Sequence, residues 1–61
     1  MKRKDFIRHL SKNGCFLERE AIKYSIFKNP VNNIEVSVTR HREIADFSAK
    51  KICKELQIKT P

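Results

Sequence analysis

Two histidines are the only side chains of this 61-residue chain that change charge near neutral pH. His9 stands among charged residues of a predicted helix, a setting more typical of a solvated surface residue than of a catalytic one. His41 belongs to the segment Arg40-His41-Arg42-Glu43, where three potential cations and one carboxylate share a predicted loop. Such a loop contacts phosphate in some proteins and is merely solvated in others. The sequence leaves both possibilities open for this segment.

No pattern in the chain indicates a metal site, a cofactor or a catalytic triad. Cys15 and Cys53 lie far apart and have no second cysteine or histidine at metal-ligand spacing. Nothing resembles a nucleophile elbow, a glycine-rich phosphate loop or a His-x-x-x-His pair. Each cysteine has apolar neighbours, so we expect both to be small buried residues that stay reduced, rather than disulfide partners. We expect no metal and no cofactor.

The charge of the chain favours a polyanionic partner. Lysines and arginines number 14 against 7 aspartates and glutamates, which gives a net charge of +7. A basic domain attracts nucleic acid because its cations replace the counterions of the phosphates, whatever the base sequence. Many small basic domains nevertheless bind no nucleic acid, so charge alone leaves RNA binding as one hypothesis among several.

Residues 1–61 have room for a single domain, and a chain of this size buries only about 60% of the surface that it exposes when unfolded. A partner or oligomerisation commonly supports such a small core. No apolar run approaches membrane-spanning length, and Met1–Asp5 is not followed by the apolar core of a signal peptide. We therefore expect a cytoplasmic protein that does not enter a membrane.

Hydrophobic periodicity predicts a helix near each end of the chain. The first has an apolar stripe formed by Phe6, Ile7 and Leu10. Asn13-Gly14 supplies its stop signal. The last has apolar residues at helical spacing, namely Ala49, Ile52, Cys53 and Leu56. Asp46 or Ser48 is the expected N-cap of this second helix.

Three segments between the helices have strand composition: residues 15–20, 24–28 and 34–39. Residues 29–33 form a predicted turn, where Pro30 fixes the backbone and asparagine tolerates positive φ. The predicted fold is α+β in the order α-β-β-β-α, with a three-stranded antiparallel sheet and both helices on one face. The other face stays open to solvent, and we expect a functional site there.

Five short segments follow one another over nearly the whole chain in an order and spacing typical of one family. They are Lys4-Asp5-Phe6-Ile7, Lys12-Asn13-Gly14-Cys15, Ser25-Ile26-Phe27-Lys28-Asn29-Pro30, Arg40-His41-Arg42-Glu43-Ile44 and Lys50-Lys51-Ile52-Cys53. Together they resemble the HicA toxins of bacterial toxin–antitoxin pairs. The resemblance implies a fold similar to double-stranded-RNA-binding domains and an endoribonuclease that cleaves messenger RNA without a metal. It also implies a HicB-type antitoxin that covers the active site.

Tyr24 stands where the resemblance places the single functional histidine of the family, immediately before Ser25 on the second strand. Metal-free RNA cleavage needs one group to take the proton of the ribose 2′-hydroxyl and another to protonate the departing oxygen. Imidazole suits both roles, whereas only about one phenol in a thousand is ionised at pH 7. The resemblance therefore implies a catalytic position that is inactive or weakened in this chain. Tyr24 could instead be an ordinary strand residue or stack on a base.

The candidate RNA contacts are Lys23, Arg40, His41, Arg42, Lys50 and Lys51. Under the first interpretation, the HicB-type antitoxin covers the face that carries Tyr24. A second interpretation is a non-catalytic module that resembles a double-stranded-RNA-binding domain, in which Lys50 and Lys51 contact phosphates near the start of the last helix. A third is a structural subunit whose positive charge serves an acidic protein partner.

Overall fold

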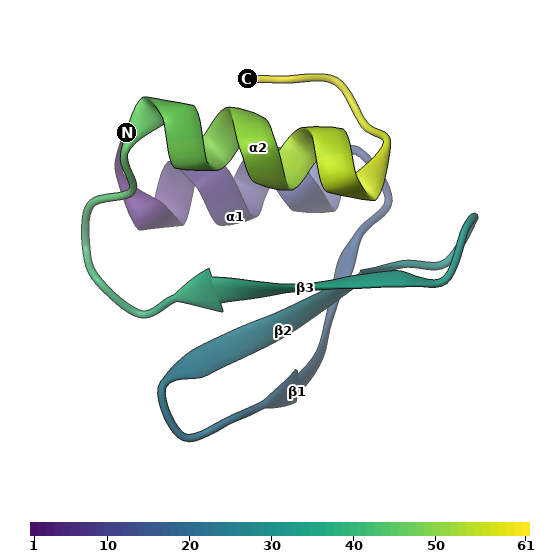
Figure 1. Cartoon of the computed structure of the whole chain (residues 1–61), viewed down its shortest axis with the longest axis horizontal. Helices are drawn as coiled ribbons and strands as arrows, with labels where there is room; N and C mark the ends of the chain where they lie inside the picture. The colour runs from purple at the N-terminus through teal and green to yellow at the C-terminus, as the bar shows by residue number, and fades with distance from the viewer.

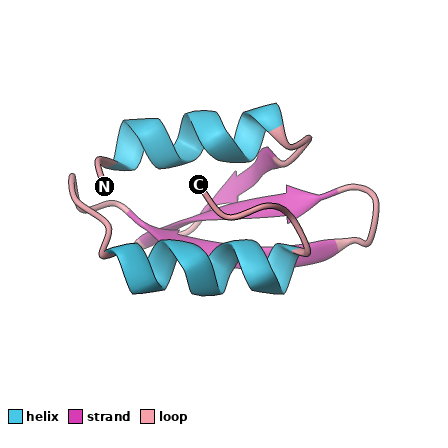
Figure 2. Ribbon diagram, turned by 90° about the horizontal axis from the view of Figure 1, so that it is seen from above, coloured by secondary structure: helices cyan, strands magenta, loops and turns pink.

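Five elements follow one another in the order α-β-β-β-α in a computed structural model that describes all 61 residues (Figure 1). They are α1 (Arg3–Lys12), β1 (Phe16–Glu20), β2 (Tyr24–Asn29), β3 (Ile34–Thr39) and α2 (Asp46–Leu56). The strands form one antiparallel sheet in the order β1-β2-β3. Both helices lie side by side on one face of this sheet, and the other face is uncovered (Figure 2). The predicted fold class is confirmed.

The core lies between the sheet and the helices because side chains alternate along the strands. Phe27 on β2 faces the helices, and β3 presents Val36 and Val38 to the same side. Ten buried residues form one cluster there: Phe6, Leu10, Cys15, Phe27, Val36, Val38, Ile44, Ala49, Cys53 and Leu56. Burial of each large apolar side chain contributes roughly 1.5–3 kcal/mol, so this single cluster holds both helices on the sheet.

Cys15 and Cys53 belong to this cluster, and both are buried and unpaired. Burial raises the pKa of both thiols, because a thiolate would be poorly solvated there. The prediction that both cysteines are small buried residues is confirmed.

Both helices end at a residue with left-handed backbone. At the end of α1, Gly14 adopts a φ of 85°, and its N–H donates to the carbonyl of Ser11 at 3.0 Å. The predicted stop at Asn13-Gly14 is therefore confirmed. At the end of α2, Gln57 adopts a φ of 60° and donates to the carbonyl of Lys54 at 3.1 Å. The helices have 10 and 11 residues, and neither is long and apolar enough to cross a membrane.

The predicted N-cap of α2 is wrong. The helix begins at Asp46, the cap position is Ala45, and no side chain caps the first turn; Ser48 lies inside the helix. The buried Ile44 explains the difference, because its N–H donates to the carbonyl of Met1 at 2.8 Å. This backbone bond, rather than a capping side chain, fixes the direction in which the chain enters the helix. The Asp46 carboxylate still lies in the first turn, where the helix dipole favours negative charge.

The edge strand β1 contains one extra residue. Leu17 pairs with Phe27 and Arg19 pairs with Ile26, so Glu18 has no partner of its own on β2. This arrangement is a β-bulge. All five residues of β1 are exposed, and a bulge makes such an edge a poorer template for a foreign strand.

The turn between β2 and β3 is tied to the end of α2. Asn29 is 4% exposed, and its Nδ2 donates to the carbonyl oxygen of Leu56 at 2.8 Å. Asn32 Nδ2 donates to the same oxygen at 3.0 Å. The side-chain oxygens of the two asparagines accept from the N–H groups of Val31 and Ile34. Since the last carbonyls of a helix have no partner within the helix, the two asparagines supply one.

We expect Asn29→Ala to lower the free energy of unfolding by about 1–3 kcal/mol, because it removes the buried hydrogen bond from the side chain to the Leu56 carbonyl and the bond that Oδ1 accepts from Val31. Asn32→Ala is the matched control: this residue is only half-buried, so its loss should be smaller. Urea denaturation followed by circular dichroism measures both changes. Equal losses in the two variants would show that the burial of Asn29 adds nothing.

Candidate functional site

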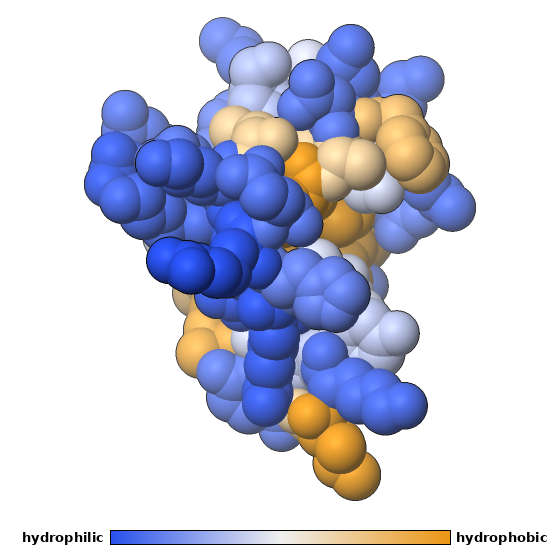
Figure 3. All heavy atoms as spheres, turned by 90° about the vertical axis from the view of Figure 1, so that its left-hand side faces the viewer, coloured by the Kyte–Doolittle hydropathy of each residue, from blue (hydrophilic) through white to orange (hydrophobic).

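One end of the molecule, on the left in Figure 1, gathers the start of both helices, the end of β3 and the turn between β1 and β2. An open pocket of about 610 Å³ lies at this end. Its lining is entirely charged and consists of Lys2, Arg3, Lys4, Arg40, Arg42 and Glu43. Figure 3 faces this end and shows hydrophilic side chains over much of it. With five cations and one carboxylate, these residues form what we call the cationic pocket.

A short backbone ladder brings the two parts of the pocket together. The N–H of Arg3 donates to the carbonyl of Arg42, and the N–H of Ile44 donates to the carbonyl of Met1, both at 2.8 Å. Lys2 and the loop residue Glu43 pair across this ladder in antiparallel fashion. The ladder places the basic residues that begin α1 beside those of the loop that joins β3 to α2.

A chain of hydrogen bonds runs beneath the pocket through four side chains, which we call the Glu20 network: Arg3, Glu20, Ser25 and Arg40. Arg3 donates from Nη2 to Ser25 Oγ at 2.9 Å and from Nε to the carbonyl of Thr39 at 2.7 Å. The Ser25 hydroxyl donates to Glu20 Oε1 at 2.6 Å. Arg40 Nη2 donates to the same Oε1 at 3.1 Å and also to the carbonyl of Ala21. The network therefore joins α1, β1, β2 and the end of β3.

The network lowers the pKa of the Glu20 carboxyl. The largest cause is the hydrogen bond from the Ser25 hydroxyl, which favours the ionised form. The charge of Arg40, its hydrogen bond and the more distant charge of Arg3 act in the same direction, while partial desolvation opposes them. Glu20 is exposed, so water screens these charges and the ionised carboxylate is also solvated.

Tyr24 lies at the same end of the sheet as the cationic pocket but on the other face. It is the first residue of β2, and it pairs with Thr39 at the end of β3. Since successive strand residues point to opposite faces, the buried Ser25 faces the helices and Tyr24 faces the open side, where it is 46% exposed. Tyr24 does not line the pocket. The expectation of a site on the open face therefore fits Tyr24 and does not fit the pocket.

The loop after β3 contributes two of its three predicted phosphate contacts to the pocket. Arg40 and Arg42 both line it. His41, between them, is exposed and does not line it; its backbone N–H donates to Thr39 Oγ1 at 3.3 Å.

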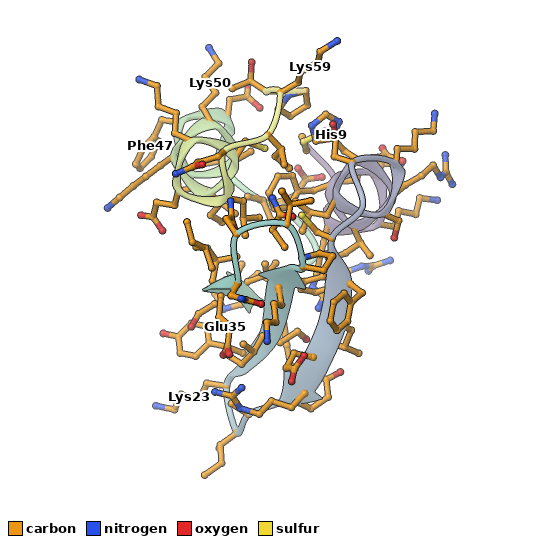
Figure 4. All side chains as sticks on the ribbon, turned by 90° about the vertical axis from the view of Figure 1, so that its right-hand side faces the viewer. His9, Lys23, Glu35, Phe47, Lys50 and Lys59 are labelled. Atoms are coloured by element: carbon orange, nitrogen blue, oxygen red, sulfur yellow. The ribbon has the colours of Figure 1, made fainter.

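The predicted lysine contacts are not gathered at the pocket. Lys23 in the turn between β1 and β2 lies on the opposite side of the molecule from Lys50 on α2 (Figure 4). Lys51 is the next residue of α2, and all three lysines are exposed. None of the three lines the cationic pocket, and the structure does not bring Lys23 and Lys50 together.

His9 is not the fully solvated residue that the sequence suggested. It is half-buried in the last turn of α1, and its Nε2 lies 2.6 Å from the carbonyl oxygen of Lys59 (Figure 4). The reason is that the segment after α2 returns across this turn of α1. His9 is thus at the opposite end of α1 from the cationic pocket.

Sequence reasoning missed several residues of this region, among them the buried Ser25. Lys2, Arg3 and Lys4 look in the sequence like a basic terminus, and only the basic run itself could have signalled a binding role. Glu20 follows two other charged residues in an exposed strand and carries no signal of its own. These side chains gain their roles from contacts between distant segments.

Neither a cluster of metal ligands nor a similar protein indicates what this site binds. No three His, Cys, Asp or Glu side chains lie together as a metal ion would require. No protein-family model matches the chain, and no curated protein and no solved structure is significantly similar to it. Function must therefore be inferred from the residues of this end of the molecule.

We expect the pKa of Glu20 in the folded protein to lie below its ordinary value of 4.5. Ser25→Ala and Arg40→Gln should each raise it, because each removes a group that favours the ionised carboxylate. An NMR titration of the Glu20 side-chain carboxyl measures all three values. An unchanged pKa of Glu20 in either variant would contradict the cause assigned to that residue.

The lowered pKa also predicts how stability depends on pH. Because the carboxyl binds its proton less tightly in the folded protein, its stabilisation is fully present above about pH 4.5 and is lost as pH falls through the folded pKa. Glu20→Gln should remove this part of the acid dependence. Melting temperatures of the two proteins should therefore differ more at pH 6 than at pH 3.

Proposed function

We propose that this chain is an RNA-binding domain of the HicA toxin type, in which phosphates of messenger RNA bind in the cationic pocket. The observation that carries the proposal is the entirely charged lining of that pocket, with five cations and one carboxylate. None of the lining residues is hydrophobic. The lining suits phosphate, because arginine can donate two parallel hydrogen bonds to its oxygens.

The orientation of the helices supports the same ligand. Both helices begin at the end of the molecule that contains the pocket, so the positive ends of both helix dipoles lie there (Figure 1). Lys2, Arg3 and Lys4 belong to the start of α1 or precede it. Helix dipoles and side-chain charges therefore act together on an anion at this place.

Tyr24 supplies the second part of the proposal. It pairs with Thr39, whose carbonyl holds Arg3 of the pocket, so residue 24 and the pocket lie on two sides of one sheet end. An RNA strand that crosses this end can contact both. A neutral phenol can stack on a base but is a poor proton acceptor, so cleavage by this chain is weak or absent. A HicB-type antitoxin would cover the open face, where Phe16 and Tyr24 are 43% and 46% exposed.

A duplex-binding module is the alternative, because the fold also exposes the turn between β1 and β2 and two lysines of α2, which a duplex could contact. This turn projects from the sheet at the same end as the pocket, and its Ile22 is 94% exposed (Figure 1). Lys50 and Lys51 are also exposed on α2. A strong preference for duplex over single-stranded RNA in a competition assay, with no cleavage by any residue-24 variant, would favour this alternative. Under either interpretation the ligand is RNA, so the proposal places the protein in the cytoplasm.

We expect Tyr24→His to raise the rate of cleavage of a defined single-stranded RNA by about 100-fold or more, because imidazole can both take and give a proton at neutral pH. The experiment contains no metal and includes a chelator. Tyr24→Phe is the matched control: it keeps the ring and should bind RNA like the unmodified chain without cleaving it. Equal cleavage by all three proteins would remove residue 24 from the mechanism.

We expect Arg42→Gln to weaken RNA binding and to make the plot of log affinity against log salt less steep by about 0.7–1. Lys12→Gln makes the same charge change in the last turn of α1, away from the pocket, and should change the slope less. Fluorescence anisotropy of a labelled RNA at several salt concentrations measures both. Equal slope changes would mean that phosphates do not bind preferentially in the pocket.

A further inference from the structure

We infer that Glu20 is a positioning residue for phosphate: an acidic side chain that strengthens anion binding because it holds two arginines of the cationic pocket in place. The inference rests on the proposed function, since it names the residue that orders the RNA-binding side chains. Simple electrostatics gives the opposite expectation, because a negative charge near an anion site weakens binding. The sign of the effect therefore separates the two explanations.

The geometry around one carboxylate oxygen carries the inference. Glu20 Oε1 accepts from the Ser25 hydroxyl at 2.6 Å and from Arg40 Nη2 at 3.1 Å. The same Arg40 nitrogen donates to the carbonyl of Ala21. Ser25, which is 1% exposed, accepts in turn from Arg3 Nη2 at 2.9 Å. One exposed carboxylate thus fixes Arg40 directly and Arg3 through a buried hydroxyl.

Some guanidinium nitrogens of Arg3 and Arg40 make no hydrogen bond within the network and can donate to a phosphate. Arg3 uses Nε and Nη2 within the protein, and Arg40 uses Nη2 alone. No hydrogen bond within the protein engages Nη1 of Arg3, or Nε and Nη1 of Arg40. Each guanidinium is therefore fixed by one or two of its nitrogens, and its other nitrogens can donate hydrogen bonds to a ligand. A mobile arginine would lose its conformational freedom on binding, whereas these two lose much of it on folding.

Glu43 provides an internal comparison, because it is the acidic residue that lines the same pocket. Its side chain is 71% exposed, and its one ion pair joins Oε2 to the amino group of Met1 at 3.6 Å. It makes no hydrogen bond to an arginine of the pocket. Glu43 therefore contributes a negative charge without ordering any phosphate-binding group.

The test measures the affinity of a fluorescently labelled single-stranded RNA for the unmodified chain, Glu20→Gln and Glu43→Gln at pH 7 and low salt. Each variant removes one negative charge from the region. Glu43→Gln should bind about twofold more tightly, as the loss of one screened charge predicts. Glu20→Gln should bind about three- to tenfold more weakly, because the hydrogen bonds donated by Arg40 and Ser25 lose the negative charge of their acceptor.

Tighter or unchanged binding by Glu20→Gln, with Glu43→Gln behaving as expected, would overturn the positioning role and leave the proposed function intact. Failure of the unmodified chain to bind RNA even at low salt would instead contradict the proposed function. A second pair of variants, Arg40→Gln with and without Glu20→Gln, distinguishes the positioning role from a folding defect. In an Arg40→Gln background, confirmed as folded by circular dichroism, Glu20→Gln should lose most of its weakening effect. The same weakening in both backgrounds would show that Glu20 does not act through Arg40.

Discussion

The backbone ladder between residues 1–3 and 42–44 is the constraint on which the charged end of this fold depends. Its bond from Arg3 to Arg42 places the first turn of α1 against the loop after β3. Its bond from Ile44 to Met1 buries Ile44 and fixes the entry into α2, which begins two residues later. One short piece of β structure outside the sheet thus determines the start of both helices and the shape of the pocket between them.

The elements were predictable from the sequence because each depends on neighbouring residues. The helical spacing of Phe6 and Leu10, the alternation along β3 and the Asn13-Gly14 stop are all local signals. The pocket was only half predictable. The basic composition of the segment around Arg40 indicates a binding role. Its pairing with the first residues of the chain joins segments about forty positions apart, and no local sequence pattern predicts such a pairing. The N-cap of α2 was wrong for the same reason, since a distant backbone bond replaced the expected side chain.

Tyr24 and Ser25 show how adjacent residues can belong to separate parts of a site. Ser25 is buried on the helix side and completes the Glu20 network, whereas Tyr24 is half-exposed on the open face. A change at position 24 therefore alters the chemistry of the open face without breaking the hydrogen bonds beneath the pocket. The same separation explains how the fold and the pocket coexist with a tyrosine in a position where the resemblance implies a histidine.

The bulge at Glu18 determines which charged side chain of β1 lies beside Ser25 in the Glu20 network. Beyond it, Glu20 pairs with Ser25, and Arg19 points to the open face, where it forms an ion pair with Glu35 at 2.8 Å. If the pairing of Leu17 with Phe27 continued along the same sequence with no bulge, Arg19 would lie opposite Ser25 and Glu20 would lie opposite Tyr24. The same sequence paired without the bulge would therefore exchange acid for base on both faces, while the hydrophobic core, which contains no side chain of β1, kept its composition.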